Sequence, residues 1–272
     1  MADASDPLIH DPLGGVPRLL EIMRRLRDPQ TGCPWDIEQT FETIAPFTIE
    51  EAYEVADAIE RKNWTDLEGE LGDLLLQVVY FAQMGSEEEK FTFESIANTI
   101  SDKMVDRHPH VFGDSSPNKS AEQQTRDWET QKAKERATRG ETRVLDGVAM
   151  GLPALTRALK LQKRASRVGF DWGNTKDVLA KIVEEAHEVA EAAAKKDPDK
   201  IEDEIGDLLF VVANLARHLN ISPEDALRRT NAKFIRRFNY IEDELHADGR
   251  APNQASLAEM DGLWDAAKAL EK

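Results

Sequence analysis

Apolar residues recur every three to four positions over long stretches of the chain. Residues 49–60 show this spacing, with apolar or alanine side chains at Ile49, Ala52, Tyr53, Ala56 and Ile59. The same period runs through residues 93–107 and 225–245, and it is typical of amphipathic helices. Residues 67–84 are apolar on nearly every side and predict a central, buried helix. Since no stretch alternates apolar and polar residues between turn signals, we expect an all-α fold with little or no sheet.

The chain contains an internal sequence repeat. Residues 184–192 match residues 50–58, and residues 203–213 match residues 69–79, in both cases 134 positions later (184 − 50 and 203 − 69). Two copies are too few for a solenoid, so the repeat predicts tandem helical-bundle domains. We place the boundaries at the following ranges: an N-terminal tail 1–16, a first domain 17–137, a glycine-containing linker 138–152 and a second domain 153–272. A polar loop is expected at 113–124.

Each copy carries two pairs of acidic residues, and the members of a pair lie three positions apart. The pairs are Glu185 with Glu188 and Glu204 with Asp207 in the second copy, and Glu51 with Glu54 and Glu70 with Asp73 in the first. Residues three apart share a helix face, so the four carboxylates of a copy converge if its two helices pack side by side. Two like charges ~4 Å apart repel by about 4 kcal/mol at an effective dielectric near 20, so such a cluster needs a cation, raised pKa values or wider spacing.

Ligands that are all oxygen select hard ions, here Mg²⁺, with Mn²⁺ as the alternative. A di-iron site would need a histidine three residues after a glutamate, but His187 stands two after Glu185 and faces away. A solvated acidic face is the competing interpretation. Gly72 and Gly206 precede the last carboxylate of each copy and indicate a close approach there, either by a ligand or by a tightly packed helix.

Basic residues accompany the second cluster. Lys181 and Lys200 each precede a glutamate by four residues, and Lys233 with Arg237 form a later basic pair. Cations beside metal-binding carboxylates are typical partners of a polyphosphate, although salt bridges to the glutamates are the simpler alternative. The first copy keeps Lys103 and Arg107 but has Phe47 and Asp66 in place of the two lysines at 181 and 200. We therefore expect the second copy to be the main site and the first to be a weaker, altered or structural one.

Composition narrows the function further. A net charge of −17 disfavours binding to duplex nucleic acid or to an anionic membrane. The single cysteine, Cys33, excludes an internal disulfide and favours a cytoplasmic location. The first fifteen residues lack the apolar core of a signal peptide, and no apolar run is long enough to span a bilayer. Trp264 is a candidate for stacking on a nucleobase, with core packing as the alternative.

Taken together, these motifs resemble the MazG family of nucleoside triphosphate pyrophosphohydrolases. The resemblance rests on the duplicated EExxE…ExxD with a downstream KxxxR, and on RLRDPQTGCPWD, ELGDLL, RHPHVFGD and VGFDW. It implies an all-α fold, a homodimer, Mg²⁺ dependence and hydrolysis of nucleoside triphosphates to monophosphate and pyrophosphate with broad base tolerance. The implied metal ligands are Glu185, Glu188, Glu204 and Asp207. The implied nucleotide contacts are Lys181, Glu184, Lys200, Asp207, Lys233, Arg237 and Trp264.

We assign catalytic roles to Lys181, Glu184 and Glu185, with Glu184 orienting either the attacking water or the sugar. Clearing of non-standard nucleotides from the pool is one cellular role that fits, and lowering a nucleotide-derived signal is another. Two rival functions stay open: a non-catalytic helical protein whose acidic face binds a basic toxin or regulator, and a diphosphatase that removes a single phosphate.

Overall fold

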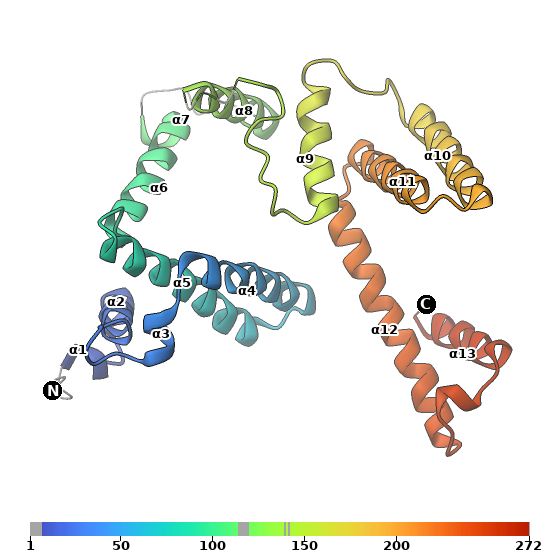
Figure 1. Cartoon of the computed structure of the whole chain (residues 1–272), viewed down its shortest axis with the longest axis horizontal. Coiled ribbons are helices and arrows are strands. Elements are labelled where there is room, and N and C mark those ends of the chain that lie inside the picture. The colour runs from blue at the N-terminus through green and yellow to red at the C-terminus, as the bar shows by residue number, and fades with distance from the viewer. Residues whose placement is uncertain (1–6, 114–119, 139, 141, 272) are drawn as a thin grey trace. The chain divides into compact units, whose positions relative to one another are not determined.

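The computed structural model describes residues 7–113, 120–138, 140 and 142–271 (Figure 1). Throughout these residues the regular structure is helical, and no strand occurs among them. The all-α prediction is therefore confirmed for the described chain. Of the loop expected at 113–124, residues 114–119 lie outside the described residues, and residues 121–124 belong to α8, so the loop prediction is wrong for those four.

The chain divides into two compact units, the first ending at Trp128 and the second beginning at Glu129. The division falls inside α8, which spans Ala121–Thr138. The linker proposed at 138–152 begins at Thr138, the last residue of α8. The seven helices that precede α8 among the described residues are α1 (Pro7–His10), α2 (Gly15–Leu26), α3 (Pro34–Glu38), α4 (Phe41–Arg61), α5 (Trp64–Glu87), α6 (Phe93–Arg107) and α7 (Pro109–Phe112).

In the first unit α5 packs along α4 and against α2 and α6. Its C-terminal half supplies Val79, Tyr80 and Met84 to a core that also contains Met23 and Ile44. The N-terminal half instead exposes apolar side chains, with Leu71 50% and Leu75 36% exposed. The helix predicted as central and buried over 67–84 is therefore buried only in its second half.

The second unit repeats this arrangement. After α8 it contains α9 (Ala154–Ser166), α10 (Thr175–Lys195), α11 (Pro198–His218), α12 (Pro223–Ala247), the 3₁₀ turn η1 (Pro252–Gln254) and α13 (Leu257–Leu270). Within this unit α10 packs along α11, α9 packs against α11 and α12, and α13 packs against α12. Figure 1 shows α13 beside the far part of α12, away from the α10–α11 pair.

A two-residue turn sets the register of each helical hairpin. Lys62 and Lys196 both end their helices in the left-handed region at φ 55°. The next residues, Asn63 and Asp197, cap α5 and α11 by accepting a hydrogen bond from the backbone N–H three residues on. Because the turn is the same in both units, the paired helices have the same register in each.

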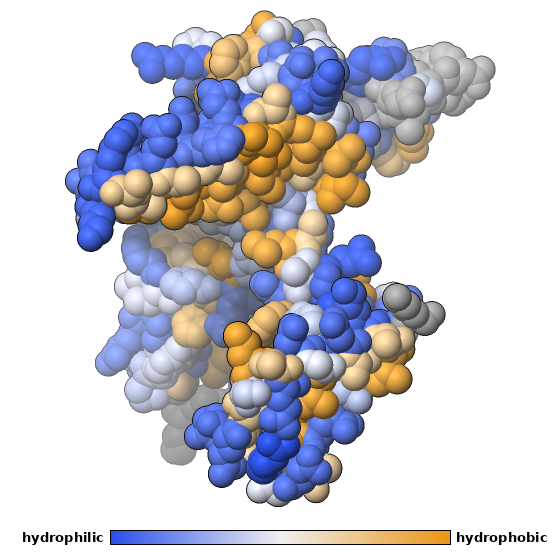
Figure 2. Space-filling view, turned by 90° about the vertical axis from the view of Figure 1, so that its right-hand side faces the viewer, coloured by the Kyte–Doolittle hydropathy of each residue, from blue (hydrophilic) through white to orange (hydrophobic). Residues whose placement is uncertain are grey.

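One face of α10 and α11 is apolar and exposed. Its members include Leu179, Val183, Ile205, Leu209 and Val212, which are between 42% and 57% exposed. Figure 2 shows apolar side chains gathered on the side of the molecule that carries these helices. Among the described residues, no helix combines the length and the apolar character needed to cross a membrane.

Candidate functional site

The α10–α11 hairpin brings three glutamates together. Glu185 and Glu188 come from α10 and Glu204 from α11, and one carboxylate oxygen of each lies within 4.8 Å of the others. Glu185 and Glu204 are buried, at 4% and 8% exposure. The predicted convergence of these three side chains is what the structure shows. Asp207 lies one turn further along α11, is exposed, and does not belong to this group of three.

The oxygens of Glu185 are unequally satisfied. Oε1 forms an ion pair with Lys181 Nζ at 2.7 Å, whereas Oε2 is buried and has no hydrogen-bond partner within the described chain. Leaving such a buried acceptor unpaired costs about 1–3 kcal/mol, and more if it is charged. A divalent cation would satisfy this oxygen and the neighbouring carboxylates at once. The residues present therefore fit a hard metal ion.

Two lysines lie at the edge of the cluster. Lys181 Nζ also pairs with Glu184 Oε1 at 2.8 Å, and Lys200 Nζ pairs with Glu204 Oε1 at 3.2 Å. The hydrogen bonds to Glu184 and then Glu185 raise the pKa of Lys181, and the bond to Glu204 raises the pKa of Lys200. The salt bridges raised as the alternative from the sequence are thus present in the structure. It also places both ammonium groups next to the candidate metal ligands.

The first unit holds a second cluster, Glu51, Glu70 and Asp73, whose carboxylate oxygens likewise lie within 4.8 Å of one another. By the repeat these residues correspond to Glu185, Glu204 and Asp207, so the two clusters share two of their three positions. Burial and then the charges of Asp73 and Glu54 raise the pKa of Glu51. Glu54 is exposed and stands outside the group of three, although its charge acts on both Glu51 and Glu70.

The cation beside the first cluster is one that sequence reasoning missed. Arg61 pairs with Asp57 and with Asp66, the residue that stands where the second unit has Lys200. Its charge opposes the rise in the pKa of Glu70. The four-residue spacing of Asp57 and Arg61 was the signal available in the sequence.

The MazG nucleotide pyrophosphohydrolase domain family matches residues 39–112 and 174–241, which are the two hairpins with the helix that follows each. The chain belongs to this MazG family. It is 51% identical to a nucleoside triphosphate pyrophosphohydrolase of Escherichia coli (strain K12) over 258 residues, covering 94% of this chain and 98% of that protein.

Two other relatives of the MazG chain carry similar names. A nucleoside triphosphate pyrophosphohydrolase/pyrophosphatase MazG of Thermotoga maritima is 44% identical, over 92% of this chain and 94% of its own. A nucleoside triphosphate pyrophosphohydrolase of Mycobacterium tuberculosis is 36% identical over 56% of this chain and 46% of its own.

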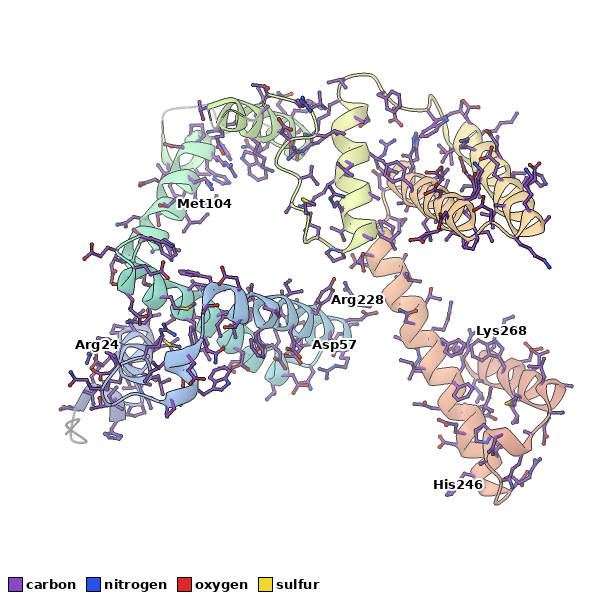
Figure 3. All side chains as sticks on the ribbon, viewed as in Figure 1. Arg24, Asp57, Met104, Arg228, His246 and Lys268 are labelled. Atoms are coloured by element: carbon purple, nitrogen blue, oxygen red, sulfur yellow. The ribbon has the colours of Figure 1, made fainter. Side chains whose placement is uncertain are left out.

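The remaining candidate nucleotide contacts lie on α12 and α13: they are Lys233, Arg237 and Trp264. Arg237 lies over the ring of Trp264, 5.2 Å from its centroid, and Phe234 contacts the same ring at 5.3 Å. Trp264 is half-buried there. Lys233 stands one turn before Arg237 on α12. Figure 3 shows α13 and the adjoining part of α12, where Lys268 and His246 are labelled, apart from the α10–α11 hairpin.

The equivalent residues of the first unit have different contacts. Trp128 Nε1 donates to the Arg107 carbonyl oxygen at 3.0 Å, and its ring contacts His108 at 5.1 Å. Lys103 lies one turn earlier on α6.

The glycines beside the last carboxylate of each copy differ from the prediction. A Cβ added at Gly72 or Gly206 would meet no neighbouring atom of the described chain within 4 Å. The close approach predicted at these glycines is therefore not seen among the described residues.

Ionisation of Glu188 should weaken the metal-free fold. Burial, and next the charges of Glu204 and Glu185, raise its pKa above 4.5, so the folded state holds this proton more tightly than the unfolded state. The stabilisation is full below the unfolded pKa and is lost as pH rises through the raised one. We expect Glu188→Gln in EDTA to raise the thermal midpoint more at about pH 7 than at about pH 4. A difference that is independent of pH would contradict this explanation.

Proposed function

We propose that this chain hydrolyses nucleoside triphosphates to monophosphate and pyrophosphate at the α10–α11 cluster, with Mg²⁺ as the cofactor and Mn²⁺ as a substitute. The observation that carries the proposal is the convergence of Glu185, Glu188 and Glu204 around a buried, unpartnered oxygen with two lysines beside them. Membership of the MazG family supports the reaction class. The names of the relatives support the substrate class.

The acidic side chains hold the ion. Glu185, Glu188 and Glu204 present their oxygens together, and Asp207 follows on the next turn of α11 and would complete the set. The chemistry supplied by a bound divalent ion is polarisation of phosphate oxygens and activation of water for attack on phosphorus. In the reaction water adds at the α-phosphorus, the bond from that phosphorus to the α–β bridging oxygen breaks, and pyrophosphate leaves.

The lysines exchange partners during substrate binding. In the metal-free chain Lys181 and Lys200 neutralise the ligand carboxylates. The flexible lysine stems would allow both ammonium groups to turn from these carboxylates to the phosphates of a bound substrate. Glu184, which releases Lys181 in this exchange, is then able to accept a hydrogen bond from the attacking water or the sugar.

Lys181→Met and Lys200→Met should each raise the KM for ATP by about tenfold, since each removes one charge-assisted contact with the triphosphate. Lys195→Met is the matched control, because Lys195 forms a similar four-residue pair with Glu191 on α10, away from the cluster. Steady-state kinetics of the three variants measures the effect. Equal KM values for all three would show that the two lysines serve only as salt bridges.

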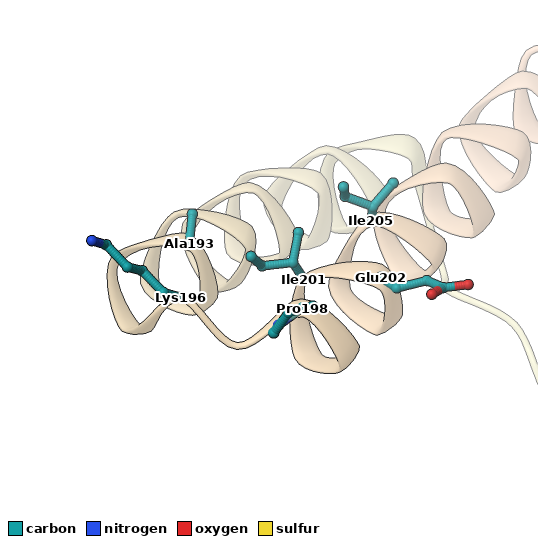
Figure 4. Close-up of a pocket in the computed structure, with 6 residues that line it drawn as sticks. All are labelled: Ala193, Lys196, Pro198, Ile201, Glu202 and Ile205. Carbon is teal, nitrogen blue, oxygen red and sulfur yellow. The ribbon is translucent and has the colours of Figure 1, made fainter.

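The exposed apolar face suggests how the site is completed. We propose that a second copy of the chain covers Leu179, Val183, Ile205 and Leu209, forming a homodimer. An apolar hollow at the end of the α10–α11 hairpin extends this face (Figure 4); it is lined by Ala193, Lys196, Pro198, Ile201, Glu202 and Ile205. The open space at Gly206 would admit a helix of that copy. Lys233, Arg237 and Trp264 then reach the nucleotide in the assembled dimer.

Broad base tolerance follows if the base is held by stacking, because every base has a π-face. We expect kcat/KM for ATP, GTP, CTP and UTP to agree within about tenfold, and Trp264→Ala to lower all four values together by about 10- to 100-fold, as loss of ~1–3 kcal/mol of stacking implies. A loss confined to one base would instead indicate hydrogen-bond recognition. A cytoplasmic role in clearing nucleotides, without duplex nucleic acid or membrane partners, is consistent with the strongly acidic composition.

Product analysis tests the proposal directly. Incubation of the chain with ATP and Mg²⁺ should yield AMP and pyrophosphate. Formation of ADP and phosphate would identify a diphosphatase. Absence of any product would favour the non-catalytic alternative, an acidic surface that binds a basic regulatory protein.

A further inference from the structure

Arg237 has an acidic partner at the end of α13. Its Nε and Nη2 donate to the same oxygen of Glu271, Oε2, at 3.0 Å and 2.5 Å. Arg236 Nη2 lies 3.5 Å from the other oxygen, Oε1. The Arg237 side chain is only 14% exposed and its guanidinium lies over the Trp264 ring. Its orientation is therefore fixed on one edge by a carboxylate and on one face by an aromatic ring.

We propose that Glu271 is a positioning residue for nucleotide binding, which holds the Arg237 guanidinium so that Nη1 is left as the donor to a phosphate oxygen. The inference rests on the proposed function, in which Arg237 contacts the nucleotide. Glu271 acts through Arg237 and does not itself touch the substrate.

The internal repeat provides independent support. Glu271 stands seven residues after Trp264, and the first copy has Glu135 seven residues after Trp128. Seven residues are about two helical turns, so Trp128 and Glu135 share a face of α8, and Glu271 follows Trp264 at the same spacing as the C-cap of α13. Each copy also keeps the arginine of its KxxxR pair, at Arg237 and Arg107. The glutamate thus accompanies the arginine and tryptophan even in the copy that lacks the two lysines.

Pre-organisation explains why a carboxylate next to a phosphate-binding arginine is useful. A free arginine side chain loses rotamer entropy when it is fixed on a ligand, and a side chain already held in place loses less. The Arg237 hydrogen bond holds the pKa of Glu271 below its usual range, so the pair persists at neutral pH. The carboxylate also offsets part of the positive charge of Arg237. If that effect dominated, Glu271 would oppose nucleotide binding, and Glu271→Gln would lower the KM.

The structure offers a matched control on the same helix. Glu259, at the start of α13, pairs with Arg250 through Oε1 at 2.5 Å and so also ties α13 to the region that follows α12. If Glu271 only fastened the helix, replacement of either glutamate would have a similar effect on activity.

The test is a kinetic cycle on the full chain with ATP and Mg²⁺. Glu271→Gln should raise KM about three- to tenfold with kcat within about twofold, and Glu259→Gln should leave both unchanged. In an Arg237→Ala background, Glu271→Gln should have no further effect. The inference is overturned if Glu271→Gln leaves KM unchanged or lowers it, if Glu259→Gln matches it, or if its effect persists without Arg237.

The same cycle separates this inference from the proposed function. An unchanged KM in Arg237→Ala alone would remove Arg237 from the nucleotide site, and Glu271 with it. A raised KM in Arg237→Ala together with no effect of Glu271→Gln would reject only the positioning role. Thermal unfolding midpoints of each variant establish that the chains compared are folded.

Discussion

Glu185→Gln is expected to lower kcat for nucleoside triphosphate hydrolysis at least about a thousandfold, with little loss of stability. Glu185 is the most buried of the three converging glutamates, and its Oε2 has no partner within the described chain. Glutamine keeps the shape of the side chain but removes the charge that a divalent ion requires. It also relieves the repulsion by Glu188 and Glu204, so the thermal midpoint in EDTA should stay the same or rise.

The matched variant is Glu51→Gln, which makes the same change in the first unit. Because Phe47 and Asp66 stand where the second unit has Lys181 and Lys200, we expect this variant to retain most of the wild-type kcat. Steady-state assays of pyrophosphate release measure both variants. If Glu51→Gln abolished turnover and Glu185→Gln did not, the assignment of the principal site would be reversed.

Leu209→Glu is expected to convert the chain to a monomer and to reduce kcat/KM by more than about a hundredfold. Leu209 is 51% exposed on the apolar face of α11 that we propose a second copy covers. A carboxylate buried in that contact would lack a partner, and separation of the copies would remove Arg237 and Trp264 from the carboxylate cluster. Light scattering reports the mass and the pyrophosphate assay reports the activity.

Val168→Glu is the control for this substitution. Val168 follows α9, is 64% exposed and lies outside the α10–α11 face, so the same change should leave both the mass and the activity unaltered. An active monomeric Leu209→Glu variant would show that one chain completes the site. A wild-type chain that is monomeric and active would have the same consequence.

The sequence was sufficient to predict the hairpins and their acidic residues. Helical periodicity predicts a helix within α4, the apolar run predicts one within α5, and the repeat extends both predictions to α10 and α11. The three-residue spacing puts each acidic pair on one face. The turns at Lys62 and Lys196 set the register between the helices, but their sequences carry no comparably specific signal. The sequence therefore predicts convergence of the carboxylates only if the two helices pack side by side. The exclusion of Asp207 and Glu54 from the groups of three depends on side-chain orientation, which spacing does not determine.

Ion pairs between helices were harder to predict from the sequence. The pairing of Glu271 with Arg237 joins residues 34 positions apart, and no periodic pattern links them. Asp66 was interpreted as a lost lysine, whereas the structure shows it holding Arg61 beside the first cluster. In both cases the ion pair depends on how two helices meet, which local propensity leaves open.

Direct titration with Mn²⁺, followed by electron paramagnetic resonance, tests the central claim that Glu185, Glu188 and Glu204 hold the divalent ion. The account predicts that the wild-type chain binds Mn²⁺ at the α10–α11 cluster, that Glu204→Gln loses this binding, and that Glu51→Gln retains it. Identical stoichiometry and affinity in the wild-type and Glu204→Gln chains would contradict the account.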